Sequence, residues 1–187
     1  GREMYRHSTA HIMASAVAEL FPNTKYAIGP AIEDGFYYDF ETERPFTEDD
    51  LRAIEVKMQE IVDRNLPFQK SWLPKEAAVR EFERRNDRFK VEILAGIADP
   101  EVTLYRHGEF EDLCTGPHLP TTGRLRAFKL LSVAGSYWRG DSNRDRLQRI
   151  YGTAWDSKEQ LEAYLVRLEE AKKRDHRKLG RELDLFS

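Results

Sequence analysis

The sequence of 187 residues has little cysteine and no long apolar run. Its only cysteine, Cys114, excludes an internal disulfide and is typical of a reducing compartment. No apolar stretch approaches the roughly 20 residues that cross a bilayer. The polar start Gly1-Arg2-Glu3 is unlike a signal peptide. We therefore expect a soluble, cytoplasmic protein without membrane contact.

The sequence also lacks a strong charge of one sign. It contains 30 Lys and Arg against 33 Asp and Glu, a formal net charge of -3. Bulk charge therefore does not indicate a nucleic-acid binder, and any RNA-facing surface must come from local clustering. Hydrophobic residues make up 40% of the chain, which is enough for a core. No internal repeat or low-complexity stretch is present.

Two histidines near the start share one helix face. The apolar and small residues around His7 and His11 recur at helical spacing and predict a helix from about Glu3 to Phe21, ended by Pro22. Residues four apart lie one turn apart on the same face, so both imidazoles point the same way.

A second motif combines a thiol and an imidazole. Cys114 and His118 are also four residues apart, but Gly116-Pro117 between them predicts a turn or loop. Asp112 precedes this loop, at the end of an expected strand.

The two motifs together allow two kinds of chemistry. The imidazole pair His7 and His11 and the thiol–imidazole pair Cys114 and His118 together supply four nitrogen and sulfur ligands of the kind that zinc prefers. The same groups form a proton-transfer cluster that works near neutral pH. Three of the five histidines and the only cysteine fall in these motifs, which argues against chance surface placement.

Further elements follow from periodicity and capping signals. An Asp34-Gly35 turn predicts a hairpin, and Thr47 before three carboxylates predicts a helix that ends near Asn65. Pro74 begins a short helix that ends near Asn86, and Ser157 caps a final helix that Gly180 stops. The expected strands are Tyr26–Ile28, Phe36–Phe40, Phe68–Leu73, Phe89–Leu94, Val102–Tyr105, Glu109–Leu113, Ala127–Trp138 and Arg146–Trp155.

Two polar residues are interpreted from these elements. Strict alternation in Phe89–Leu94 places Lys90 and Glu92 on the face opposite the core, where the simplest interpretation of Lys90 is a solvated strand lysine. His107 is interpreted as a turn residue, because Gly108 follows it.

The expected hairpin over residues 127–155 is the most basic part of the chain. Its aromatic residues Tyr137, Trp138 and Tyr151 alternate with arginines and could stack on unpaired bases. The alternative is a solvated hairpin whose aromatic side chains belong to the core.

Taken together, the motifs resemble the editing domain of bacterial threonyl-tRNA synthetases. The first motif is His7-Ser8-Thr9-Ala10-His11, and the second is Cys114-Thr115-Gly116-Pro117-His118. Alanyl-tRNA editing domains share these two motifs, whereas the later blocks are specific to the threonyl family. The further blocks are Tyr26–Pro30, Asp34–Asp39, Tyr137–Asn143, Leu147–Trp155 and Lys173–Gly180.

The resemblance implies an α+β fold. Long helices would pack on a curved, largely antiparallel sheet, with the active cleft between the first helix and the sheet. Residues 1–155 would form the editing domain, and residues 156–187 a connecting helix toward an aminoacylation domain. We expect an excised, monomeric part of a synthetase that does not aminoacylate by itself.

The resemblance also implies a reaction and its residues. The expected activity is hydrolysis of the ester that joins serine to the 3′ terminal adenosine of threonine tRNA, sparing threonine by exclusion of its methyl group. The other partners would be the aminoacylation and anticodon-binding domains of the full-length enzyme. The expected catalytic residues are His7, His11, Lys90, Asp112, Cys114 and His118, and Gly29 and Tyr38 are the expected substrate-binding residues.

The resemblance favours hydrolysis without a metal. Four protein ligands would leave no free position for water on a tetrahedral zinc ion. The alternatives are zinc-dependent alanyl-type editing, with zinc on His7, His11, Cys114 and His118, a structural zinc domain on the same side chains, or a non-catalytic tRNA-binding module.

Overall fold

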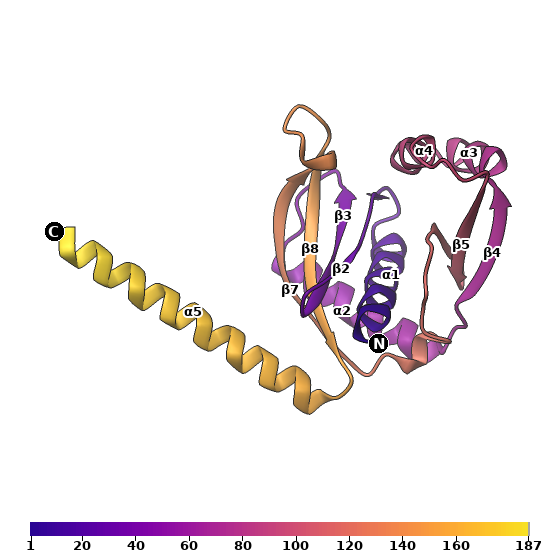
Figure 1. The fold of residues 1–187 in the computed structure, drawn as a ribbon. Coiled ribbons are helices and arrows are strands. Elements are labelled where there is room, and N and C mark those ends of the chain that lie inside the picture. The colour runs from indigo at the N-terminus through magenta and orange to yellow at the C-terminus, as the bar shows by residue number, and fades with distance from the viewer. Residues whose placement is uncertain (187) are drawn as a thin grey trace.

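The computed structural model describes residues 1–186, with side chains described through Arg181. Figure 1 shows the helices and strands in space. In chain order they are α1 (Arg2–Leu20), β1 (Lys25–Tyr26), β2 (Ala31–Ile32), β3 (Gly35–Glu41), α2 (Glu48–Arg64), β4 (Gln69–Pro74), α3 (Lys75–Arg84), α4 (Arg88–Ala95), β5 (Glu101–His107), β6 (Phe110–Leu113), β7 (Ala127–Tyr137), β8 (Arg146–Trp155) and α5 (Lys158–Phe186).

The strands form two antiparallel sheets. The larger sheet has the order β1-β3-β8-β7 with β2 also paired to β3, and the smaller one has the order β4-β5-β6. Every strand pairing in the described part of the chain is antiparallel, which confirms the α+β prediction. In place of one continuous curved sheet, α1 lies between two sheets (Figure 1). The predicted cleft lies between this helix and the smaller sheet.

Helix α1 is buried on nearly every side. The small residues Ala10, Ala14 and Ala16 are fully buried, which allows α2 and the strands β3 and β8 to approach closely. The helix begins and ends within one residue of the predicted bounds. Since both faces are enclosed, its polar side chains must find partners inside the protein.

Helix α2 forms as the sequence predicts. The Thr47 hydroxyl accepts from the Asp50 backbone N–H, and the Asp50 carboxylate accepts from the Thr47 N–H. Ile54, Met58 and Ile61 then face the main core. This reciprocal cap and apolar stripe fix α2 across one end of α1 and the larger sheet.

The predicted strand over Phe89–Leu94 is wrong, because this segment is helix α4. The Asp87 side chain caps it by accepting from the Lys90 backbone N–H. Phe89 and Ile93, one helical turn apart, pack with Trp138 and Leu147 of the β7–β8 hairpin. Leu94 packs against α3. Helix α4 therefore bridges the two sheets, and Lys90 is buried rather than solvated.

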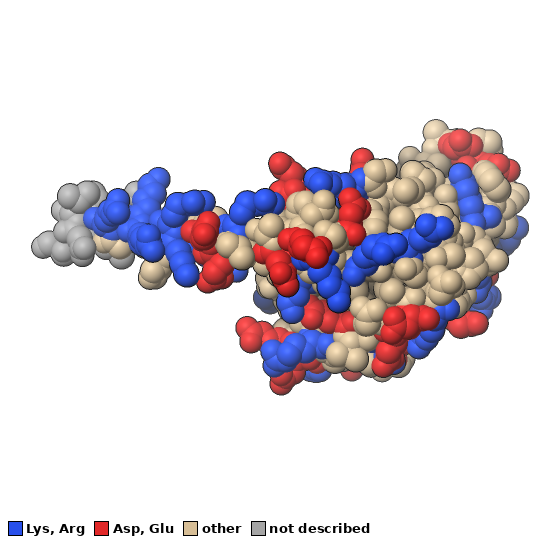
Figure 2. Space-filling view, turned by 90° about the horizontal axis from the view of Figure 1, so that it is seen from below, with Lys and Arg blue, Asp and Glu red and all other residues tan. Residues whose placement is uncertain are grey.

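The long hairpin of β7 and β8 is confirmed, and α5 follows it. Helix α5 extends away from the rest of the molecule in Figure 1 and continues through Gly180, so the predicted stop at that glycine is wrong. Tyr164 packs on Trp155 near the start of α5, whereas residues 172–181 are exposed. Basic side chains cover much of this outer part (Figure 2). Within residues 1–186, no helix is both long and apolar enough to cross a membrane.

Candidate active site

A cavity of about 560 Å³ separates α1 from the smaller sheet. Its walls come from α1, the loop between β1 and β2, α4, and the strands β5 and β6. Two predicted site residues, His118 and Tyr38, are buried behind this wall. The other six line the cavity directly, and they are His7, His11, Gly29, Lys90, Asp112 and Cys114.

The two sequence motifs meet at one wall of the cavity. The Nε2 atoms of His7 and His11 are 3.1 Å apart. The Cys114 Sγ lies 3.5 Å from Nε2 of His7 and 3.2 Å from Nε2 of His118. The helix thus presents two imidazoles to a loop that presents a thiol and a third imidazole, as the spacing predicted.

Ser8 orders this cluster, and the sequence reasoning missed it. Its Oγ accepts from the Leu119 N–H at 2.9 Å and lies 2.9 Å from Nδ1 of His118. A hydroxyl that accepts from a backbone amide keeps its own proton to donate to the imidazole. That arrangement leaves the neutral His118 ring with its proton on Nε2, facing Cys114. Ser8 is fully buried in the fold, and no signal in the sequence pointed to this role.

Burial keeps the cluster uncharged. It lowers the pKa of His7 from the ordinary 6.5, although Asp112 acts in the opposite direction. It lowers the pKa of His11 further, with the neighbouring imidazoles adding to the effect, and brings the pKa of His118 to about 3. Burial also raises the pKa of the Cys114 thiol to about 11. Near neutral pH the site therefore offers neutral imidazoles, which can accept protons, and a protonated thiol.

A buried ion pair also lines the cavity. Nζ of Lys90 is 3.3 Å from Oδ1 of Asp112 and also donates to the carbonyl of Ala27. The Lys90 and Asp112 side chains are 3% and 4% exposed. The Tyr38 hydroxyl donates to Oδ2 of Asp112 at 2.7 Å, and the Leu113 N–H donates to Oδ1 at 2.8 Å. Lys90, Tyr38 and the Leu113 N–H thus fix the Asp112 carboxylate, and Asp112 lines the cavity.

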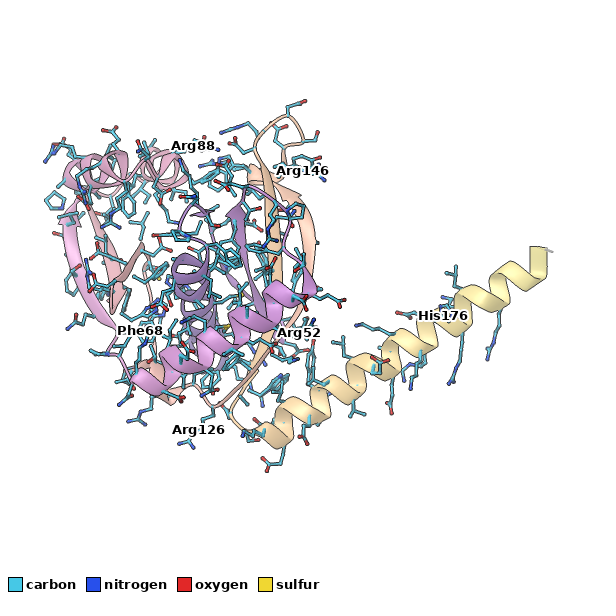
Figure 3. The ribbon with its side chains drawn as sticks, turned by 180° about the vertical axis from the view of Figure 1, so that it is seen from behind. Arg52, Phe68, Arg88, Arg126, Arg146 and His176 are labelled. Carbon is cyan, nitrogen blue, oxygen red and sulfur yellow. The ribbon has the colours of Figure 1, made fainter. Side chains whose placement is uncertain are left out.

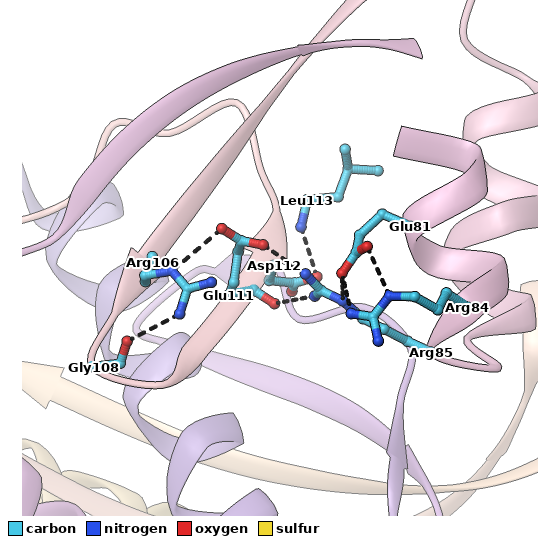
Figure 4. Close-up of polar contacts among 8 residues, drawn as sticks. All are labelled: Glu81, Arg84, Arg85, Arg106, Gly108, Glu111, Asp112 and Leu113. Carbon is cyan, nitrogen blue, oxygen red and sulfur yellow. Dashed lines mark hydrogen bonds and ion pairs between the residues drawn. The ribbon is translucent and has the colours of Figure 1, made fainter. Parts of the chain in front are cut away.

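The neighbours of Asp112 fix its strand against α3. Figure 4 shows Arg85 between Glu81 of its own helix and Glu111 of β6, with guanidinium–carboxylate distances of 2.9 and 2.6 Å. Arg106 approaches the same Glu111 carboxylate at 3.4 Å. This network holds the β6 backbone beside Asp112, although none of its side chains is a predicted site residue.

Gly29 lies against the ring of Tyr38. A Cβ atom at this position would be 2.0 Å from a Tyr38 ring carbon, so only glycine permits the contact. The Tyr38 ring is fully buried and holds Asp112, whereas Gly29 itself lines the cavity. The close backbone approach predicted at Gly29 is therefore an approach to Tyr38.

Two aromatic contacts behind the cluster were also missed. The ring of Phe68, labelled in Figure 3, stacks on His118 with centroids 4.9 Å apart. Its other neighbour is His107, whose Nε2 lies 2.9 Å from the Ser15 hydroxyl. His107 ends β5 and is 3% exposed, so its interpretation as a turn residue is wrong. Phe68 thereby supports His118 from behind.

The four clustered side chains fit zinc as a donor set. One donor atom from each of His7, His11, Cys114 and His118 lies within 4.8 Å of the others. Tetrahedral zinc with ordinary bond lengths separates its nitrogen and sulfur ligands by about 3.3 to 3.6 Å. The measured 3.1, 3.2 and 3.5 Å contacts are close to those edges. Zinc binding would require the Cys114 thiol to lose its proton.

The chain is similar to known proteins, in part and over its whole length. The model of the family "Threonyl and Alanyl tRNA synthetase second additional domain" matches residues 102–151, from β5 to β8. This range contains Asp112, Cys114 and His118, whereas His7 and Lys90 precede it.

Relatives match over the whole chain. Threonine--tRNA ligase of Verminephrobacter eiseniae (strain EF01-2) is 59% identical over 187 residues, which is 100% of this chain and 29% of the relative. The same enzyme of Azoarcus sp. (strain BH72) is 58% identical, with the same coverage. Threonine--tRNA ligase of Legionella pneumophila (strain Corby) is 59% identical over 98% of this chain. The chain spans about 29% of the length of these relatives. The chain is therefore similar over its whole length to part of threonine--tRNA ligases, and over residues 102–151 to the threonyl and alanyl tRNA synthetase second additional domain.

Proposed function

We propose that this chain hydrolyses the ester that joins serine to the 3′ terminal adenosine of threonine tRNA. The observation that supports this proposal best is that two groups of side chains line one cavity. Neutral imidazoles and a thiol form the first group, and the buried Lys90–Asp112 pair forms the second. Ester hydrolysis needs a base for water, charge stabilisation and a proton for the leaving oxygen, and these groups supply all three.

His7 is the base in this proposal. In this proposal the Ser8 hydroxyl donates to Nδ1 of His118, and Nε2–H of His118 donates to the Cys114 sulfur. The Cys114 thiol then donates toward Nε2 of His7. In this order Nε2 of His7, between the thiol and His11, is the acceptor nitrogen, and His7 lines the cavity as the most exposed of the three imidazoles. His11, 3.1 Å away, then passes a proton to or from His7.

Lys90 stabilises the developing negative charge. An ammonium has three donors, and two of them are used on Ala27 and Asp112. The third is available to the tetrahedral oxyanion. Asp112 makes its hydrogen bonds with Tyr38, Leu113 and Lys90 rather than with a histidine. Its place in this mechanism is to bind the α-ammonium of the substrate.

Selection of serine rests on size. Serine and threonine differ by one methyl group, which is worth about 1–3 kcal/mol in a binding pocket. A synthetic site that admits threonine therefore also admits serine, and a second site must remove the error. In the cavity described here, Gly29 lies directly against the fully buried ring of Tyr38, so this part of the wall has little room to move.

The deciding experiment compares serine-charged and threonine-charged threonine tRNA as substrates of the 187-residue chain. We expect loss of serine only. His7→Ala and Lys90→Ala should each lower the rate by about 100- to 10,000-fold, which is the usual contribution of one such group. The exposed Val56→Ala on α2 is the matched control. Binding of both tRNAs without hydrolysis would instead support a non-catalytic tRNA-binding module.

The same assay tests the metal. We propose metal-free hydrolysis, because four protein ligands would close a tetrahedral zinc ion to water. If zinc binds, His7, His11, Cys114 and His118 hold it, and it supplies a Lewis acid that lowers the pKa of water. Stoichiometric zinc in the purified chain, with hydrolysis abolished by a chelator, would replace the metal-free proposal by the alanyl-type alternative. Stoichiometric zinc without any hydrolysis would indicate a structural zinc domain.

We also propose a division of the chain. Residues 1–155 hold the whole cavity and form the editing unit, and residues 156–187 connect it to an aminoacylation domain. The protruding α5 and the length of the relatives support this arrangement. The remaining partners in a full-length enzyme are then the aminoacylation and anticodon-binding domains.

A further inference from the structure

Strand β4 carries an exposed indole beside a lysine. Trp72 is 59% exposed, whereas Trp138 and Trp155 are 2% and 5% exposed. Nζ of Lys70 lies 4.9 Å from the centroid of the Trp72 ring and 6.0 Å from that of Tyr105. A large apolar ring left in water, with a cation on one face, has its other face free for a planar group.

This pair lies on the sheet face that forms the cavity wall. The register of β4 and β5 places Trp72 opposite Thr103 and Lys70 opposite Tyr105. Directly opposed residues in an antiparallel ladder point to the same face. Thr103 lines the cavity, and the ring of Tyr105 contacts that of His118 with centroids 4.5 Å apart. The exposed ring is therefore one strand away from the cavity wall.

Acidic and basic side chains lie toward opposite ends of the same strands. Asp99 and Glu101 line the cavity at the end where β4 finishes, because Glu101 pairs with Pro74. Lys70 lies toward the other end of the strand. A polyanion leaving the cavity along this face is attracted toward Lys70 and repelled from the carboxylates.

The basic hairpin offers less to RNA than its sequence predicted. Trp138 is buried and donates from Nε1 to Glu92 at 2.6 Å. Arg139 and Arg144 pair with the same carboxylate, and Arg149 pairs with Asp39 at 2.8 Å. These cations are occupied within the protein, whereas Trp72 keeps an open face.

We propose that Lys70 and Trp72 hold the unpaired nucleotides next to the 3′ terminal adenosine, with a base stacked on the indole and a phosphate on the ammonium. Base–aromatic stacking of this kind tolerates any base, since every base has a π-face. The inference rests on the proposed function for the identity of the ligand. It adds the surface that would hold the strand while its terminal ester lies in the cavity.

The first test uses fluorescence and needs no catalysis. Because Trp72 is the exposed indole of three, a stacked base should quench the solvent-exposed part of the tryptophan emission. We expect the RNA trinucleotide CCA to quench it and Trp72→Phe to abolish the quenching. Lys70→Gln should weaken binding and reduce its salt dependence. Unchanged emission, the same quenching in Trp72→Phe, or the same quenching by inorganic phosphate alone would overturn the proposal.

The second test separates strand binding from the chemistry in the cavity. We expect Trp72→Ala to lower kcat/KM on seryl-tRNA roughly 5- to 100-fold through KM, measured relative to a minimal seryl-adenosine ester. Trp72→Phe should restore most of that ratio, and Val56→Ala should leave it unchanged. An equal loss on both esters indicates a structural role for Trp72 and contradicts the proposal. If the unaltered chain hydrolyses neither ester, the proposed function fails, while the trinucleotide titration still decides the surface.

Discussion

At the scale of single residues, the Lys90–Asp112 pair carries the largest stability risk. Both side chains are nearly inaccessible to water, so each charge depends on the other. We expect Lys90→Met to cost about 3–5 kcal/mol of unfolding free energy, because it leaves a buried carboxylate uncompensated. The double variant Lys90→Met/Asp112→Leu should recover part of this loss. Urea unfolding checks both, and a cost below about 1 kcal/mol for the single variant contradicts the account.

The buried histidines predict acid sensitivity. Burial brings the pKa of His107 to about 4 and that of His118 to about 3, against the ordinary 6.5. The unfolded chain therefore takes up protons first as the pH falls below about 6.5. Stability is complete above that pH and declines toward pH 4, by about 2 kcal/mol for each histidine at pH 5. Measuring unfolding free energy between pH 7 and pH 4 tests the trend.

A variant isolates one of these histidines. His107→Gln can keep a hydrogen bond to Ser15 but cannot take up the proton. Its stability should decline less steeply with acid, by about 1.4 kcal/mol per pH unit. His176→Gln on the exposed part of α5 is the control (Figure 3). An identical slope in His107→Gln and the unaltered chain argues against the assignment.

Gly29 should not tolerate a methyl group. The added Cβ of Gly29→Ala would overlap the ring of Tyr38, which is fully buried and bonded to Asp112. We expect a loss of about 1–3 kcal/mol, typical of overpacking, together with a slower hydrolysis because Asp112 moves. Gly135→Ala on β7 meets nothing within 4 Å and serves as the control. Similar unfolding midpoints for the two variants would contradict this reading.

The sequence predicted the cluster of histidines and cysteine but not the residues that contact it from behind. His7 with His11, and Cys114 with His118, could be found because spacing and residue chemistry act locally along the chain. Ser8 touches His118 across 110 residues, and no local pattern announces such a contact. For the same reason, the stacking of Phe68 on His118 became visible only in the fold.

At the scale of elements, α4 explains why Lys90 is fixed. Arg88 of α4, labelled in Figure 3, pairs with Glu41 at the end of β3 and with Asp145 just before β8. One helical turn on, Glu92 accepts from Trp138 and pairs with the arginines of the hairpin tip. The tip of the hairpin thus holds the helix that carries the lysine of the cavity.

Removing that attachment should loosen α4. We expect Glu92→Ala to speed amide hydrogen exchange across α4 and to lower the hydrolysis rate, since Lys90 loses its fixed position. The control is Glu76→Ala on α3, a residue for which the described part of the chain shows no side-chain hydrogen bond or ion pair. Unchanged exchange in Glu92→Ala would show that the apolar contacts of Phe89 and Ile93 alone hold the helix.

The elements were predictable where one period dominated. The stripe of α2 and the long strands β7 and β8 formed as expected. The segment of α4 was misread, because Phe89–Leu94 alternates in sequence, while in space Phe89 and Ile93 pack in one core and Val91 and Leu94 in another. These six residues are too few to separate the two periods, and the neighbours α3 and Trp138 decide between them.

At the scale of the whole molecule, α5 divides into an attached start and a free end. Tyr164 packs on Trp155, which in turn lies under the guanidinium of Arg6. We expect a chain that ends at Glu170 to unfold at the same denaturant midpoint as the full chain, because residues 172–181 are exposed. Tyr164→Ala should lower the midpoint. A lower midpoint on truncation would contradict this division of α5 into an attached start and a free end.

Because Cys114 is buried, its thiol should resist oxidation and attack by electrophiles. Electrophiles and peroxides attack thiolates that solvent can reach. Cys114 is 8% exposed and burial raises the pKa of its thiol to about 11, so the thiol stays protonated and shielded at physiological pH. It is also the only cysteine in the chain, so no second thiol can trap it in an internal disulfide. The sulfur that links His7 and His118 should therefore survive oxidative conditions that inactivate enzymes with an exposed, ionised cysteine.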